Sequence, residues 1–224
     1  MARSMLLACA MLSLLGNEAA AGLITYWNFN SYDGSATTIP ASLGSGTLTI
    51  TGFPDANLQN LSGTLVNALG ADPAGSSLTL TSNVNNGDFL TLAFSMGGRK
   101  DLVLTYATRR TSTGFNSDQW AYSTDGLSFT SFGSPVNPTT STTFALITRD
   151  FSSVSSLDND PSVYLRYTLS GATNSSGNNR IDNIQLNASS ATVVPEPSSV
   201  VMMGMGIVSL ICFGKRMTAV LPLS

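Results

Sequence analysis

Hydrophobic and polar residues alternate along several short segments of the chain. The pattern is clearest over residues 163–169, where every second residue is apolar and Arg166 and Thr168 stand between them. A period of two is typical of a strand that buries one face and exposes the other. The same pattern, with the turn residues around it, predicts strands at residues 23–30, 47–51, 77–81, 89–94, 102–108, 119–123, 144–151, 163–169 and 180–187.

Turn-forming residues separate these segments. Asp125-Gly126 lies between the segment that ends at residue 123 and Phe129, and an Asp-Gly pair supplies the positive φ angles of a tight hairpin. No stretch of residues 22–190 keeps helical periodicity for three turns, and no repeat of 20 to 50 residues is visible. We therefore expect one all-β domain over residues 22–190, an antiparallel jelly-roll-like β-sandwich.

Two short motifs in this domain resemble those of a known class of modules. Residues 122–126 read Tyr-Ser-Thr-Asp-Gly and are followed by Phe129, and residues 180–184 read Arg-Ile-Asp-Asn-Ile. Both are similar to motifs of exported bacterial jelly-roll modules that resemble carbohydrate-binding or discoidin-like domains. The resemblance implies that residues 180–184 belong to the closing strand of the sandwich.

The first residues have the pattern of a secretory signal peptide. Arg3 precedes an uncharged stretch over residues 4–17, and three alanines follow at Ala19, Ala20 and Ala21. A basic residue, a short apolar core and a small-residue site are what a signal peptidase recognises. We expect residues 1–21 to be a signal peptide that is cleaved after Ala21, with Ala19 and Ala21 forming the cleavage site.

A second uncharged apolar segment lies near the other end of the chain. It covers residues 198–214 and is followed directly by Lys215 and Arg216. This length is enough for one helix to cross a bilayer, and the positive-inside rule would keep the basic pair in the cytoplasm. We expect residues 191–224 to form a tail with a single transmembrane helix, which leaves residues 22–194 outside.

The residues just before this segment make the tail more specific. Pro195, Glu196 and Pro197 precede the apolar span and the basic pair, an order that resembles the PEP-CTERM sorting signal of exported proteins from Gram-negative bacteria. The resemblance implies that an exosortase, a membrane-embedded transpeptidase, recognises these three residues and processes the tail. It also implies a location in the cell envelope or outside the cell, in bacteria that commonly make extracellular polysaccharide.

The composition excludes several kinds of chemistry. The chain has no histidine, and its two cysteines, Cys9 and Cys212, lie in the terminal apolar segments. Catalytic arrangements that need a histidine base or a thiol nucleophile are therefore excluded from the domain. Residues 22–194 carry seven basic side chains against eleven aspartates, which argues against a nucleic-acid-binding surface. A pair of aspartates is the one acid–base device left, as in a glycan hydrolase.

Sugar binding is the first candidate activity of the domain. It needs aromatic rings that can stack on a pyranose, beside short polar side chains for the hydroxyl groups. Trp120 follows a loop-like stretch, so we predict that it binds sugar together with Tyr122, Asn116 and Asp118. Other aromatic residues could serve, although aromatic residues in strands more often belong to the core; these are Trp27, Tyr32 and Phe115.

Two further sites are considered on the basis of charge. A structural calcium ion, the one cofactor considered, could be held by Asp158, Asp160 and Asp182, because calcium prefers carboxylate and amide oxygens. The ordinary alternative is that these residues form turns. The basic pairs at residues 99–100 and 109–110 could meet an anionic polysaccharide, or could form salt bridges with Asp101 or Asp150.

These observations favour an exported, non-catalytic protein of the cell surface or extracellular matrix. We expect its sandwich to associate with extracellular polysaccharide or with other envelope proteins. Two alternatives remain open at this stage: a secreted glycan hydrolase that uses an aspartate pair, and a structural matrix component without a defined ligand.

Overall fold

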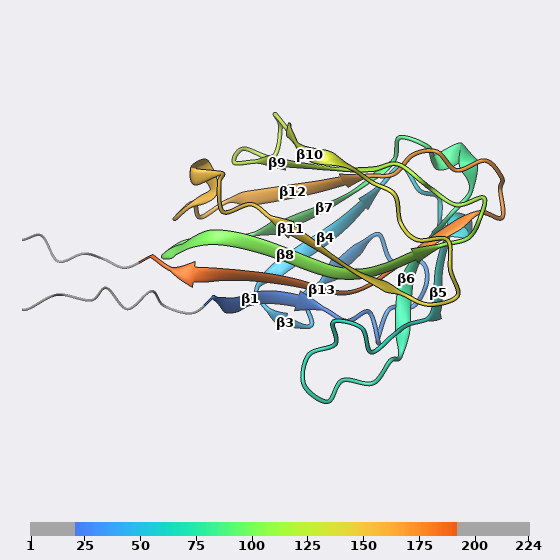
Figure 1. Cartoon of the computed structure of the whole chain (residues 1–224), viewed down its shortest axis with the longest axis horizontal. Coiled ribbons are helices and arrows are strands. Elements are labelled where there is room, and N and C mark those ends of the chain that lie inside the picture. Colours follow the sequence, from blue (N-terminus) through green and yellow to red (C-terminus); the bar gives the residue numbers. More distant parts are fainter. Residues whose placement is uncertain (1–20, 192–224) are drawn as a thin grey trace, which may run out of the picture. The chain divides into compact units, whose positions relative to one another are not determined.

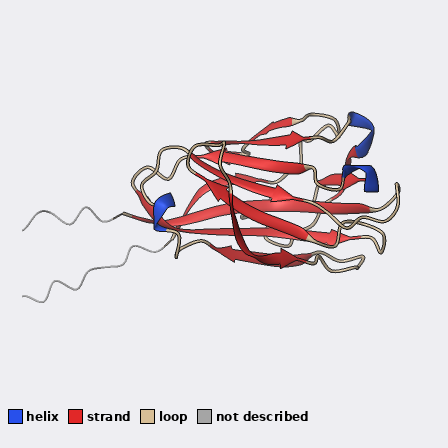
Figure 2. Cartoon of the chain, turned by 90° about the horizontal axis from the view of Figure 1, so that it is seen from above, coloured by secondary structure: helices blue, strands red, loops and turns tan. Residues whose placement is uncertain are grey.

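The computed structural model describes residues 21–191, which form two antiparallel β-sheets packed face to face (Figures 1 and 2). The predicted all-β antiparallel sandwich is confirmed. No helix within these residues is long and apolar enough to cross a membrane. The predicted sorting residues Pro195, Glu196 and Pro197, the span at residues 198–214 and the cleavage residue Ala19 lie outside the described residues.

The first sheet is built around one long strand, β13. Its main path follows the order β11 (Ala145–Asp150), β8 (Arg99–Arg110), β13 (Asn178–Ser190), β1 (Gly22–Trp27) and β3 (Leu43–Gly44). Two further strands join beside the beginning of β13, namely β6 (Ser76–Thr81) and then β5 (Leu58–Ser62). The strand β13 is therefore hydrogen-bonded to β8 along one side and to β6 and then β1 along the other.

The second sheet has six strands in a single path. Their order is β10 (Thr130–Val136), β9 (Asp118–Ser123), β12 (Val163–Thr168), β7 (Phe89–Phe94), β4 (Gly46–Thr51) and β2 (Thr38–Pro40). Three short 3-10 helices lie in the connections: η1 (Asp55–Asn57), η2 (Asn83–Asn85) and η3 (Ser155–Leu157).

The core lies between the two sheets and follows the alternation seen in the sequence. In β12, Val163, Leu165 and Tyr167 are fully buried, whereas Tyr164 and Arg166 are only half-buried. Every central strand adds inward side chains of this kind, so that one continuous apolar cluster joins the sheets. Burial of these side chains is the main force that holds the sandwich together.

Four strands escaped prediction, and β1 ends three residues earlier than expected. The missed strands β2, β3, β5 and β10 lie at the edges of the sheets, where a strand has one neighbour and tolerates Pro and Gly. Thus β2 contains Pro40, and β10 contains Gly133. The strand β1 stops at Trp27 because Phe29 takes a left-handed backbone conformation with φ +53°.

The predicted hairpin at Asp125-Gly126 is confirmed, since β9 and β10 pair antiparallel on either side of it. Asp125 accepts hydrogen bonds from the backbone amides of Leu127 and Ser128, both at 2.8 Å. These two amides hold the pKa of its carboxyl at about 2. Gly126 has φ +71°, a conformation that costs side-chain-bearing residues energy.

Replacing Gly126 with alanine should destabilise this hairpin. A Cβ atom there would lie 3.2 Å from the ring of Tyr164 in a left-handed conformation, so we expect the free energy of unfolding to fall by about 1–2 kcal/mol. Denaturant unfolding checks this, with Gly97→Ala as the control, because Gly97 is exposed and has no positive φ. Equal stability of the two variants would contradict the prediction.

The two ends of the described domain lie side by side. Gly22, at the start of β1, is paired with Ala188 near the end of β13 (Figure 1). Chain segments before β1 and after β13 are thus attached at the same end of the sandwich. The strand β13 starts at Asn178, at the opposite end of the sandwich, and Arg180 is its third residue.

Candidate functional site

Trp120, the predicted centre of a sugar site, belongs to the core. It is 2% exposed, its indole N–H donates to the hydroxyl of Tyr106 at 3.1 Å, and its ring lies 4.6 Å from that of Tyr167. No face of the ring is open to a ligand, so the expectation that it stacks on a sugar is wrong in this structure. The alternation of β9 explains the result, because Trp120 and Asp118 both point inward.

The other residues predicted with Trp120 are also spread over different environments. Asp118 is fully buried, Tyr122 is half-buried against Phe132, and only Asn116 is exposed. Of the remaining aromatic candidates, Trp27 and Phe115 are fully buried and Tyr32 is 6% exposed. These residues therefore do not form an open sugar platform.

Asp118 is held in a buried hydrogen-bond network. Its Oδ2 atom accepts from the hydroxyl of Tyr167 at 2.6 Å and from the side-chain amide of Asn179 at 3.1 Å. Burial raises the pKa of Asp118 to about 7 even though both of these bonds lower it. The carboxyl thus joins β9, β12 and β13 across the core and is closed to solvent.

The three predicted calcium ligands are not brought together. Asp158 accepts a hydrogen bond from the backbone amide of Asp101 in β8, and Asp160 lies two residues further along. Asp182 is paired with Ala107, six residues from Asp101 on the same strand, which is roughly 20 Å away. Within residues 21–191, no three Asp, Glu, His or Cys side chains are grouped closely enough to hold a metal ion.

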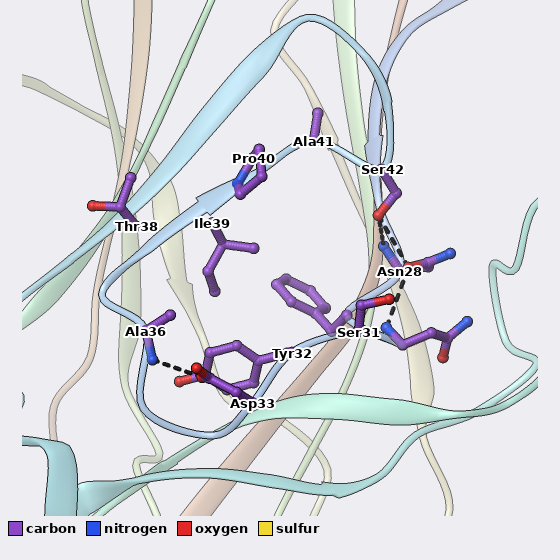
Figure 3. Close-up of a pocket in the computed structure, with 12 residues that line it drawn as sticks. Asn28, Ser31, Tyr32, Asp33, Ala36, Thr38, Ile39, Pro40, Ala41 and Ser42 are labelled. Atoms are coloured by element: carbon purple, nitrogen blue, oxygen red, sulfur yellow. Dashed lines mark hydrogen bonds between the residues drawn. The ribbon is translucent and has the colours of Figure 1, made fainter.

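A first cavity, the loop pocket, is lined by residues of the segment 28–42, which connects β1 to β3 and contains β2, and has a volume of about 490 Å³ (Figure 3). Tyr32 and Ile39 point toward its middle, and Asn28 and Ser42 lie on its rim. The rim groups bond to each other: the Ser42 hydroxyl accepts from the Asn28 backbone amide at 3.1 Å and donates to the Asn28 side-chain oxygen at 3.0 Å. These two rim groups are therefore satisfied by each other, whereas the buried hydroxyl of Tyr32 has no hydrogen-bond partner among the described residues.

A second cavity, also of about 490 Å³, is named here the arginine groove. It is lined by Arg109 of β8 and Arg180 of β13, by residues 62–64 and Val66 on one side, and by residues 142–144 on the other. Arg109 and Arg180 are direct partners in the antiparallel pairing of their strands. The two guanidinium groups thus share one groove on the first sheet.

The wall at residues 62–66 is fixed to β13 by polar contacts. The Asp182 carboxylate accepts from the backbone amide of Thr64 at 2.8 Å, and the Asn183 side chain donates to the carbonyls of Thr64 and Val66 at 2.7 and 2.9 Å. Burial raises the pKa of Asp182 to about 7, against the lowering effect of the Thr64 and Asn183 amides. Asp182 therefore serves to hold this wall in place.

The wall at residues 142–144 is fixed by Arg109 and by its own hydroxyl groups. Arg109 donates to the carbonyl of Ser141 at 2.9 Å and lies 5.5 Å from the ring centroid of Phe144. The hydroxyls of Ser141 and Thr143 are 2.9 Å apart. The half-buried Phe144 ring and the exposed Thr142 and Thr143 complete the groove.

The sequence pointed to only part of this site. The sequence places Arg109 in a basic pair at residues 109–110, with salt bridges to Asp101 or Asp150 as the alternative to an anionic ligand. In residues 21–191 the ion pair that forms is Lys100–Asp101, at 3.4 Å, and neither Arg109 nor Arg180 has a carboxylate within ion-pair distance. The pairing of Arg180 with Arg109 depends on strand order, which no local sequence signal reveals.

Neither cavity has the carboxylate pair that a glycan hydrolase needs. The loop pocket is lined by a single carboxylate, Asp33, and the arginine groove by none. Asp33 accepts from the backbone amides of Ala36 and Ser35, and these bonds lower its pKa. A general acid needs a raised pKa instead, so Asp33 is suited to closing a turn.

Comparisons with known proteins give a distant structural similarity. No protein-family model matches the chain, and no curated protein matches it. The CBM22-1 xylan-binding domain from Paenibacillus barcinonensis Xyn10C is 10% identical with a TM-score of 0.46, over 78% of this chain and 99% of its own. TmCBM61 in complex with β-1,4-galactotriose is 9% identical with a TM-score of 0.42, over 71% and 92%.

A third solved structure is similar to the same degree. The carbohydrate-binding module CBM6cm-2 from Cellvibrio mixtus lichenase 5A, in complex with cellotriose, is 12% identical with a TM-score of 0.37, over 74% of this chain and 98% of its own. At this distance, no ligand and no site position is transferred to this chain.

Proposed function

We propose that this chain is an exported, non-catalytic protein whose sandwich binds polysaccharide, and that the arginine groove is the contact surface. The groove is the observation that carries the proposal. It is open, has about 490 Å³, and combines hydroxyl groups, an aromatic ring and two guanidinium groups. Cavities of this size with a few convergent polar groups are typical of ligand sites.

The location in the proposal rests on the sequence alone. The signal-peptide pattern at residues 1–21 and the PEP-CTERM-like residues Pro195, Glu196 and Pro197 support export, processing by signal peptidase and an exosortase, and retention in the envelope or release. The non-catalytic part of the proposal is supported by the lack of a carboxylate pair in both described cavities.

Binding and turnover can be tested together on the full-length chain in a neutral detergent. We expect it to be retarded in native gels that contain polysaccharide, drawn from a panel of neutral and acidic polymers, without release of reducing ends. Phe144→Ala should weaken retention by roughly two- to tenfold, because an aromatic contact of this kind is worth about 0.5–1.5 kcal/mol. Phe144 lines the groove and is half-buried.

A matched control is available on the other sheet. Phe129 also lies over an arginine, 3.6 Å from Arg166, but outside the groove, so Phe129→Ala should leave retention unchanged. Release of reducing ends would show a hydrolase instead. Failure to retain any polymer would overturn the proposal and favour a structural component without a glycan ligand.

A further inference from the structure

Two positively charged side chains lie next to each other on neighbouring strands and line the arginine groove. Arg109 and Arg180 are paired directly across β8 and β13, which places their Cβ atoms about 4.5–5.5 Å apart. Like charges in this position repel each other. Burial and the neighbouring charge of Arg109 both lower the pKa of Arg180. The arrangement is therefore costly unless something of opposite charge is bound there.

The described part of the chain supplies no such charge. Arg109 donates to the carbonyl of Ser141, and Arg180 donates to the carbonyl of Ser62 at 3.2 Å. Asp182 is close along β13, but its two oxygens accept from the backbone amides of Thr64 and Asn183. Each guanidinium has five N–H donors. Each arginine uses one of its donors in these contacts, so both have donors left for a ligand.

Resting on the polysaccharide-binding function proposed above, we propose that the arginine groove selects sugar residues that carry a carboxylate or a sulfate group. A guanidinium matches the paired oxygens of such groups with two parallel hydrogen bonds. Arg109 and Arg180 line the same groove, so that two guanidinium groups are available to one ligand. The oxyanion of the ligand would also relieve the repulsion between the two arginines.

The walls of the groove indicate a sugar around the oxyanion. A small free anion would fill little of the 490 Å³. Thr142 and Thr143 provide exposed hydroxyl groups, and Phe144 provides a ring beside Arg109. Rings that can stack on a pyranose and hydroxyls that can bond to its own hydroxyls suit an acidic polysaccharide better than a bare ion.

The test compares polymers that differ only in charge, using the full-length chain in a neutral detergent. Polygalacturonate is paired with its methyl ester, and dextran sulfate with dextran, so that the two arms separate carboxylate from sulfate. Polyglutamate serves as a polyanion without sugar. We expect retention of at least one charged sugar polymer about tenfold or more above its neutral partner and above polyglutamate.

Variants then assign the effect to the groove. Arg109→Gln and Arg180→Gln should each weaken retention of the charged polymer about tenfold or more, and Arg180→Lys should retain an intermediate part. Arg99→Gln removes the same charge at the far end of β8 and should have no effect. Fluorescence of the buried Trp27 and Trp120 would verify that each variant is folded.

The outcomes separate this inference from the proposed function. Equal retention of charged and neutral sugar polymers would overturn the inference and leave polysaccharide binding intact. Equal retention of polyglutamate, or an equal loss in Arg99→Gln, would show recognition of charge alone and would also overturn it. If no polysaccharide is retained at all, both the inference and the proposed function fail.

Discussion

Replacing Trp120 with alanine should lower the free energy of unfolding by about 3–5 kcal/mol. The side chain is 2% exposed and packs against Tyr106 and Tyr167, so its removal leaves a cavity that the surrounding strands cannot fill. The Tyr106 hydroxyl also loses the indole N–H that donates to it. Such a loss is a large part of the roughly 5–15 kcal/mol that stabilises a typical domain.

Chemical denaturation followed by the fluorescence of Trp27, the other tryptophan of the chain, would measure this change. Asn116→Ala is the matched control, because Asn116 was predicted to act with Trp120 but its side chain is exposed. It should change stability by less than about 0.5 kcal/mol. If Trp120→Ala unfolds at the same denaturant concentration as the parent protein, the assignment of this ring to the core is wrong.

The domain should lose stability as the pH rises from about 4 to about 7. Burial raises the pKa of both Asp118 and Asp182 to about 7 in the folded protein, whereas an unfolded chain has the ordinary value near 4. The fold therefore favours the protonated carboxyls. Their contribution to the free energy of unfolding is fully present at a pH below the pKa of the unfolded chain. It is lost as the pH rises through the pKa of the folded protein. One pKa unit is worth about 1.4 kcal/mol, so each group should remove several kcal/mol.

Denaturant unfolding at pH 4.5 and at pH 8 would test this expectation. Asp118→Asn and Asp182→Asn keep the shape of the side chain and remove the ionisation, so each should flatten the pH dependence. Asp33 and Asp150 are exposed carboxyls with lowered pKa values, and they act in the opposite direction only below about pH 4. Greater stability at pH 8 than at pH 4.5 would contradict the assignment.

The inner strands, which have a neighbour on each side, could be predicted because burial of one face gives a regular alternation of apolar and polar residues in the sequence. The alternation predicts a strand at residues 89–94, and β7 has these bounds because its alternate residues face the core. Edge strands leave a weaker mark. In β5, Gln59 and Asn60 are exposed and only Leu58 is buried, so the apolar alternation that reveals an inner strand is missing.

The candidate site was harder to predict than the fold because it joins distant parts of the chain. The loop-like stretch before Trp120 predicts an exposed ring, yet the alternation within β9 turns it inward. No local signal in the sequence marks Arg180 or Phe144 as a site residue. They line the groove only because β13 lies beside β8 and because residues 142–144 reach Arg109. Both arrangements depend on the strand order, which is a property of the topology.

The position of the groove along β13 also determines how the domain would respond to mechanical tension. Arg180 lies near one end of this strand, and Ser190 is the last residue at the other end, roughly 33 Å away. A force between these points would run along β13, across hydrogen bonds to β6, β8 and β1 that lie perpendicular to it. These bonds would be sheared together and could not be unzipped one at a time, so the domain would resist a force applied between these two points.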